Sequence, residues 1–194
     1  MEKSKYIRES LLESSKLKKE IIENCELEII RAIDLIVSAY KNGKKLLLVG
    51  NGGSAADCQH IATELMIRLN HQIKRPALPA IALTTDSSNL TAGGNDIGYE
   101  NVFARNVEGL GNEGDVLWAI STSGNSPNII RAIEVARSKK MHVLGLTGLT
   151  GGKMFNMCDV LIRVPSENTQ RIQEGHLVVE HIICELVELE LYCN

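Results

Sequence analysis

The stretch LLLVGNGGSAADCQHIATEL, residues 46–65, decides the fold class of this chain. Its first four residues are a short apolar run, which is typical of a buried strand. Glycines then interrupt the run, and a Ser begins a segment with helical periodicity. A strand, a glycine-rich turn and a helix in this order open a parallel α/β sheet, in which ligands bind where the strands end.

The rest of the chain repeats this alternation of strand and helix. We predict strands at 44–49, 79–83, 115–121, 141–147 and 159–165, and helical segments at 54–69, 86–109, 127–140 and 169–191. The strands are apolar toward both faces, which indicates a parallel sheet covered by helices on both sides. Because the chain has no internal repeat, linker or low-complexity tract, we predict that residues 1–194 form a single α/β domain.

Residues 1–42 precede the first strand, and we predict that they form a pair of helices. Apolar residues recur at helical spacing on the first helix and again on the second, and Gly43 ends the stretch. The first set is Ile7, Leu11, Leu17, Ile21 and Ile22, and the second is Leu27, Ile30, Ile33, Ile36 and Val37. Helical hairpins of this kind often pack against a partner chain, so we assign the pair to oligomerisation.

Composition and charge exclude several classes of protein. The net charge is −3, so non-specific binding to nucleic acid is not expected. No apolar run approaches the length of a membrane span, and the charged N-terminus lacks the apolar core of a secretory signal. The five cysteines are odd in number and show no CxxC spacing. We therefore expect a cytoplasmic protein with reduced thiols and no cysteine-based metal site.

Two predicted strand ends carry polar loops that contain glycine. The first is GNGGS, residues 50–54, and the second is STSGNS, residues 121–126. The second loop places four hydroxyl groups directly before a helix, whose free N–H groups favour an anion. Neither loop contains Lys or Arg, which favours a monoester phosphate over a triphosphate with magnesium. The alternative is that Ser and Gly serve only as turn and N-cap residues.

A rival interpretation of the first loop is a dinucleotide site. Gly50, Gly52 and Ala55 match the pattern GxGxxG/A. Such a site also needs an acidic residue about 20 positions later to bind the ribose. The segment NHQIKRPALP has no acidic residue, and Asp86 comes too late. A nicotinamide cofactor is therefore disfavoured.

His60 and Glu64 lie four residues apart on the helix after the first loop, so their side chains share a face. The last predicted helix carries further polar residues at Gln173, Glu174, His176 and His181. A set of His, Glu and Gln side chains could bind zinc or move protons. The alternative is a solvated ion pair without a functional role.

Four motifs follow one another along the chain: GNGGSAAD, STSGNSPN, LTGLTGG, and RIQEGH with a later EH. Together they resemble the sugar isomerase (SIS) domain and, more narrowly, the phosphoheptose isomerases. The resemblance covers the whole chain and implies a flavodoxin-like, three-layer fold with a five-stranded parallel sheet. It also implies a homotetramer with active sites between subunits. The implied reaction converts sedoheptulose 7-phosphate to D-glycero-D-manno-heptose 7-phosphate through an enediol, the first step of ADP-heptose and lipopolysaccharide core synthesis.

The resemblance also implies roles for residues of this chain. The base would be Glu64 and the acid His181. One zinc ion per subunit would be bound by His60, Glu64, Gln173 and His181. The phosphate would be bound by Ser54, Ser121, Thr122, Ser123 and Ser126, and the sugar hydroxyls by Asn51, Asp96 and Arg68. The other residues assigned to substrate binding are Gly52, Gly53, Asn95 and Gln173. The chain departs from some members of the family at Thr169-Gln170, where they carry an acidic residue.

Spacing on the last helix bears on the zinc assignment. Gln173 and His181 are eight residues apart, which is about 12 Å along one continuous helix. Gln173 therefore either lies on an irregular first turn, or the two ligands come from different subunits. Glu64 has two competing roles, because a carboxylate that ligates a metal is less available as a base.

The sequence leaves two other functions open. A related SIS-domain protein is a non-catalytic replication regulator that binds the initiator protein DnaA, and it lacks the counterparts of Glu64 and His181. A silent sugar-phosphate sensor is the broader form of this alternative. Isomerases of other sugar phosphates, such as arabinose 5-phosphate, usually carry appended CBS domains.

Overall fold

The computed structural model describes residues 2–193. Within these residues, no helix combines the length and the apolar character that crossing a bilayer requires. The elements in chain order are α1 (Lys3–Lys41), β1 (Leu46–Val49), α2 (Gly53–Met66), β2 (Ala80–Ala82), α3 (Ser87–Asp96), α4 (Tyr99–Leu110), β3 (Val116–Ile120), α5 (Pro127–Ser138), β4 (His142–Thr147), the short 3-10 helix η1 (Gly152–Asn156), β5 (Val160–Arg163) and α6 (Thr169–Tyr192).

The strands form one parallel sheet in the order β2-β1-β3-β4-β5. The five predicted strands are confirmed, and each is one to three residues shorter than predicted. From β1 the chain continues to β2 on one side and then to β3 on the other. The connections therefore diverge between β1 and β3, and such a switch point leaves room for a ligand at the carboxyl ends of the strands.

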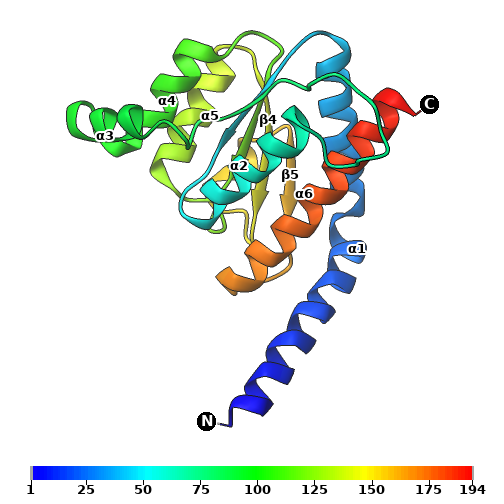
Figure 1. The fold of residues 1–194 in the computed structure, drawn as a ribbon. Coiled ribbons are helices and arrows are strands. Elements are labelled where there is room, and N and C mark those ends of the chain that lie inside the picture. Colours follow the sequence, from blue (N-terminus) through cyan, green and yellow to red (C-terminus); the bar gives the residue numbers. More distant parts are fainter. Residues whose placement is uncertain (1, 194) are drawn as a thin grey trace.

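Helices cover both faces of the sheet and make three layers (Figure 1). Alternate side chains of β1 point to opposite faces, as they must in a pleated strand. Leu46 and Leu48 pack with α1, α2 and α6, whereas Leu47 and Val49 pack with α4 and α5. The predicted α/β class and the flavodoxin-like, three-layer arrangement are confirmed.

The N-terminal region is one helix of 39 residues, so the predicted pair of helices is wrong. No Gly or Pro lies between Lys3 and Lys41, so nothing interrupts its hydrogen bonds. One stripe at four-residue steps faces the core: Leu17, Ile21, Cys25 and Ile29. Ile22 and Leu27 lie on the exposed side of the helix, out of phase with this buried stripe. The change of phase in the sequence therefore resembled a boundary between two helices. The N-terminal turns of α1 project away from the sheet (Figure 1).

The largest of the other differences in helix boundaries concern two predicted helices. The helical segment at 86–109 is divided into α3 and α4, because Ile97 and Gly98 are not helical. The helix predicted at 54–69 corresponds to α2, which ends at Met66 rather than at Leu69. The chain then leaves the helix axis and runs through residues 67–79 to β2.

Candidate active site

The candidate site lies at the carboxyl ends of β1 and β3, where the connections diverge. The side-chain amides of Asn51, after β1, and Asn128, in the first turn of α5, exchange two hydrogen bonds of 2.9 Å. Asn51 Oδ1 also accepts a hydrogen bond of 3.2 Å from the Tyr99 hydroxyl. The two predicted loops are therefore neighbours, and Asn51 links the first loop to the helix that follows the second.

A cavity of about 300 Å³ opens beside the second loop. Hydroxyl side chains are prominent on its wall: Thr122, Ser123, Thr150, Ser166 and Thr169. Among the described residues that line it there is no Lys or Arg, and the charged residue is Glu167. Thr150, Ser166 and Glu167 were not predicted. The motif LTGLTGG was the signal for Thr150, whereas Ser166 and Glu167 follow β5 without a motif of their own.

The other hydroxyls predicted to bind the phosphate, those of Ser54, Ser121 and Ser126, are not among the residues that line this cavity. Ser121 is 5% exposed, and its Oγ lies 3.1 Å from the Oγ of Ser126. Ser54, in the first turn of α2, is 3% exposed. Ser123 Oγ accepts a hydrogen bond of 3.2 Å from the Asn125 N–H. The loop is therefore shaped by its own hydrogen bonds, and Thr122 and Ser123 are its hydroxyls on the cavity wall.

His60 and Glu64 on α2 meet His181 on α6. The Nε2 atoms of His60 and His181 are 2.7 Å apart, and their rings meet edge to face with centroids 4.9 Å apart. Glu64 Oε1 lies 3.6 Å from His60 Nε2. Because one imidazole nitrogen must donate and the other accept, the two rings share one proton at this contact. Three side chains that can carry protons are thus brought together from two helices.

Gln173 lies beside the N-terminal end of α2, away from His60 and Glu64. A Cβ added to Gly53 would come within 2.2 Å of Gln173 Nε2, so this amide covers the first turn of α2, two turns before His60. α6 is helical from Thr169 onward, which makes the alternative of an irregular first turn wrong. Among residues 2–193, no group of three or more His, Cys, Asp or Glu side chains is arranged to hold a metal ion.

The remaining predicted sugar-binding residues lie on other segments. Asn95 and Asp96 end α3, where Asn95 Nδ2 donates a hydrogen bond of 2.7 Å to Asp96 Oδ1. Arg68 lies in the segment after α2. Within residues 2–193, no hydrogen bond or ion pair joins these three side chains to the STSGNS loop (the serine loop, residues 121–126) or to the pair of His60 and His181. Gly52 and Gly53 form the exposed start of α2.

Three further titratable side chains on α2 and α6 are partly or fully buried. Burial raises the pKa of Asp57, one turn before His60, to about 6, and His60 partly opposes the shift. Burial, with the nearby Asp57, raises the pKa of Glu180, and neither oxygen of Glu180 has a hydrogen-bond partner among the described residues. Burial lowers the pKa of His176 to about 4. The sequence singled out His176 but missed Glu180, whose signal was a lone charge within the apolar run LVVEHII.

Comparisons with known proteins agree with this architecture. The sequence matches the SIS domain family over residues 11–148. It is 50% identical over 193 residues to a phosphoheptose isomerase of Aneurinibacillus thermoaerophilus, covering 97% of this chain and 96% of the relative. It is 54% identical over 172 residues to phosphoheptose isomerase 2 of Campylobacter jejuni, covering 89% of this chain and 81% of the relative.

Solved structures give the same result. The structure of a phosphoheptose isomerase from Francisella tularensis matches with a TM-score of 0.93 and 39% identity, covering 97% of this chain and 99% of that chain. The structure of the phosphoheptose isomerase GmhA from Neisseria gonorrhoeae matches with a TM-score of 0.89 and 42% identity, covering 95% of this chain and 97% of that chain. The chain therefore belongs to the SIS-domain family and, within it, to the phosphoheptose isomerases, which are sugar-phosphate isomerases.

Proposed function

We propose that the protein converts sedoheptulose 7-phosphate to D-glycero-D-manno-heptose 7-phosphate, the first step toward ADP-heptose and the lipopolysaccharide core. The observation that carries this proposal is that His60 and Glu64, on the helix that starts at the GNGGS loop, meet His181 on α6. The cavity beside the second loop supplies hydroxyl donors for a phosphate and has no Lys or Arg on its wall. One end of the substrate would thus be anchored while the other faces groups that move protons.

The chemistry requires one proton to move between two adjacent carbons. A base takes a proton from C1, which leaves an enediol, and returns it to C2. Glu64 is suited to this step because it is a carboxylate only 17% exposed on the helix that starts at the GNGGS loop. A second proton must move from O1 to O2, and His181 can carry it because the unperturbed pKa of His lies near neutrality. In the site without a metal ion, His60 can return a proton to His181 through the hydrogen bond between their rings.

Incubation with sedoheptulose 7-phosphate, followed by detection of an aldoheptose phosphate, tests the proposal directly. Formation of the aldose supports it. Binding of the sugar phosphate without any product would instead favour the silent sensor, and binding to DnaA would identify that sensor as a replication regulator. Turnover of arabinose 5-phosphate in place of the heptose would assign the site to a shorter sugar.

We also propose that one zinc ion per subunit binds at His60, Glu64 and His181. Two imidazoles and a carboxylate are the chemistry of a catalytic zinc site with an open position. The two imidazole nitrogens lie 2.7 Å apart, whereas nitrogens bound to one tetrahedral zinc are separated by about 3.3 Å. Binding therefore requires the histidine pair to open. Gln173 would join the set only from another subunit, and the ion would stabilise negative charge on O1 and O2.

Metal analysis after exposure to zinc checks this assignment. We expect about one zinc per chain in the wild type and much less in His60→Asn, because the variant removes one of three ligands. A chelator should lower activity, and added zinc should restore it. His142→Asn is the matched control, since His142 is an exposed residue on β4. Full turnover by protein shown to be free of metal would leave the three residues as acid–base groups alone.

The phosphate assignment predicts the effect of removing two hydroxyls. We expect Ser121→Ala combined with Ser123→Ala to raise the KM for the sugar phosphate at least tenfold. Ser123 lies on the cavity wall, where a hydrogen bond to a charged group contributes about 1.5–3 kcal/mol, and Ser121 supports the loop through its contact with Ser126. Ser138→Ala is the control, since its hydroxyl only donates to the Val135 carbonyl at the end of α5. Steady-state kinetics measure both variants. An unchanged KM in the double variant would show that the phosphate binds elsewhere.

We further propose a homotetramer whose active sites draw residues from more than one chain. An apolar groove of about 420 Å³ runs between α1 and α6, with Ile22 and Ile182 on its walls. Exposed apolar residues continue along the N-terminal part of α1 at Tyr6, Ile7, Leu11 and Leu12. Surfaces of this kind on a soluble domain mark interfaces. A second long helix with the same stripe would cover the groove.

Light scattering checks the assembly. We expect wild-type particles of four chains, each of 21.3 kDa, and smaller particles for Ile22→Glu, because a charge in the groove opposes burial against a partner. If the active sites are shared between chains, the activity of Ile22→Glu should fall together with the mass of its particles. Leu110→Glu, a substitution at another exposed apolar residue, on α4, serves as the control. A stable, fully active wild-type monomer would overturn the proposal.

A further inference from the structure

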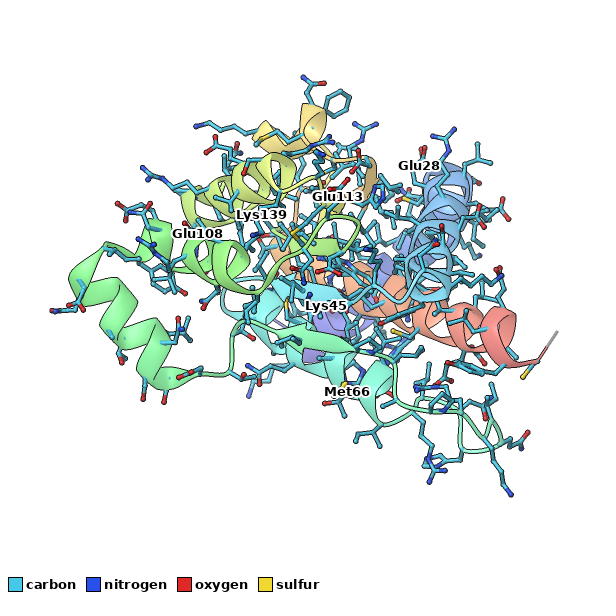
Figure 2. The ribbon with its side chains drawn as sticks, turned by 90° about the horizontal axis from the view of Figure 1, so that it is seen from above. Glu28, Lys45, Met66, Glu108, Glu113 and Lys139 are labelled. Atoms are coloured by element: carbon cyan, nitrogen blue, oxygen red, sulfur yellow. The ribbon has the colours of Figure 1, made fainter. Side chains whose placement is uncertain are left out.

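The segment 67–79 carries a buried ion pair that the proposed chemistry does not use. Arg75 and Glu188 have side chains 1% and 0% exposed, and Arg75 Nη2 lies 2.6 Å from Glu188 Oε1. Arg75 comes from the segment that follows α2, and Glu188 comes from the C-terminal part of α6. Figure 1 shows this segment crossing over α6, and Figure 2 shows it leaving α2 at Met66.

All three nitrogens of the Arg75 guanidinium are engaged. Nε donates a hydrogen bond of 2.7 Å to Glu188 Oε1, and Nη2 forms the ion pair with the same oxygen and donates to the Glu64 carbonyl oxygen at 2.8 Å. Nη1 donates to the carbonyl oxygens of Leu65 at 2.7 Å and Pro76 at 2.9 Å. Arginine has five such donors in a fixed plane, so the group can hold all these partners in one geometry only.

The Glu188 carboxylate is equally well bound. Its Oε1 accepts a hydrogen bond of 3.1 Å from the Leu69 N–H, and its Oε2 accepts one of 3.1 Å from the Asn70 N–H. Arg75 supplies the remaining bonds to Oε1. Glu180, two turns earlier on the same helix, has no partner for either oxygen among the described residues. Of these two buried carboxylates on α6, Glu188 alone is built into a network.

This network connects the two helices that carry the proposed acid–base groups. The carbonyls of Glu64 and Leu65 lie in the last turn of α2, where carbonyl groups lack partners within the helix. α2 has no basic residue of its own in that turn, so Arg75 supplies the cation that a helix C-terminus favours. Because Glu188 belongs to α6, the pair fixes the end of α2 against the helix that carries His181.

Stability alone does not explain a buried pair of this kind. Removing two charges from water is costly, and apolar side chains of similar size are often as stabilising or more so. The distinctive property of the pair is its geometry, which fixes two helices and the backbone of the segment 67–79 at Leu69 and Asn70. A displacement of about 1 Å at a reacting group can lower a rate a hundredfold.

We infer that Arg75 and Glu188 form a positioning pair that sets the placement of Glu64 relative to His181 and thereby supports proton transfer. The inference rests on the roles proposed above for Glu64 and His181. Neither Arg75 nor Glu188 would touch the substrate. Their effect would be on kcat rather than on KM, because the phosphate is bound by the loops at the other end of α2.

Two conservative variants test the pair. We expect Arg75→Lys and Glu188→Gln to lower kcat for sedoheptulose 7-phosphate about tenfold to a hundredfold with KM changed less than about threefold. Lysine keeps the charge but cannot hold a carboxylate and three carbonyls in one plane. Arg137→Lys is the matched control, because Arg137 also binds a carboxylate and a carbonyl, those of Asp159 and Met157, at an exposed site. A wild-type kcat in both variants would overturn the inference.

A double variant separates positioning from folding. Arg75→Met with Glu188→Leu removes both charges and leaves neither one buried without its partner. We expect this protein to fold by circular dichroism yet to keep the low kcat of the single variants. Rescue offers a further check: guanidinium at millimolar concentration should raise the kcat of Arg75→Ala and leave that of the double variant unchanged. Wild-type activity in the folded double variant would contradict a positioning role.

The imidazole NMR signals of His60 and His181 report the placement without any substrate. We expect these signals to shift in Arg75→Lys and in the double variant, and to stay unchanged in Arg137→Lys. If the wild type fails to isomerise the heptose, the proposed function fails while this measurement still tests the pair. Unchanged imidazole signals in folded variants would reject the positioning role by itself.

Discussion

Glu64→Gln is expected to lower kcat for sedoheptulose 7-phosphate by about 10²–10⁴-fold, the usual effect of removing a positioned general base. Gln has nearly the shape of Glu, so it should preserve the packing of α2, whose carbonyl at this residue is held by Arg75. It cannot accept the C1 proton. The hydroxyl-lined cavity is unaltered, so calorimetry should still detect binding of the sugar phosphate with an affinity close to that of the wild type.

Proton exchange isolates the chemical step in this variant. In deuterated water the wild type should exchange the C1 proton of the substrate, and Glu64→Gln should lose this exchange together with isomerisation. Glu108→Gln is the control, because Glu108 is an exposed Glu on α4, whereas α2 packs on the other face of the sheet. Figure 2 shows Glu108 well apart from Met66 at the end of α2. Normal exchange by Glu64→Gln would mean that another group is the base.

The sheet was predictable because its strands are short apolar runs separated by helical patterns. The strand ends at Gly50 and Ser121 also indicated the ligand edge, since parallel strands bring their carboxyl ends together. The long N-terminal helix was not predicted correctly. Its apolar residues serve two faces, one against the core and one exposed, and a change of phase between Ile22 and Leu27 looked like a break.

The site was predictable only in part. Spacing on one helix placed His60 beside Glu64, but the meeting with His181 depends on how α2 packs against α6, which periodicity does not report. The residue types of Arg75 and Glu188 gave no signal at all. A basic residue in a polar segment and an acid near the end of a helix are typical of solvent-exposed positions. Their burial follows from the crossing of that segment over α6.

Gly124→Ala is expected to destabilise the fold by about 3 kcal/mol or more and to abolish binding of the sugar phosphate. Gly124 has a φ of +64°, a conformation that alanine adopts only at a cost. A Cβ at this position would lie 2.1 Å from the Gly151 carbonyl oxygen and 2.6 Å from its carbon. These are backbone atoms that cannot rotate away. The serine loop and the loop after β4, which both line the cavity, would have to separate.

Gly43→Ala separates the cost of the positive φ from the cost of the clash between the added Cβ and the backbone of Gly151. Gly43 has a φ of +68°, but a Cβ there would meet no atom within 4 Å. This variant therefore carries only the conformational cost, about 1 kcal/mol, and should bind the sugar phosphate normally. Urea unfolding and calorimetry compare the two variants. If Gly124→Ala matched Gly43→Ala in both stability and binding, the STSGNS loop and the loop after β4 would have room to separate. Their close approach would then have no part in shaping the cavity.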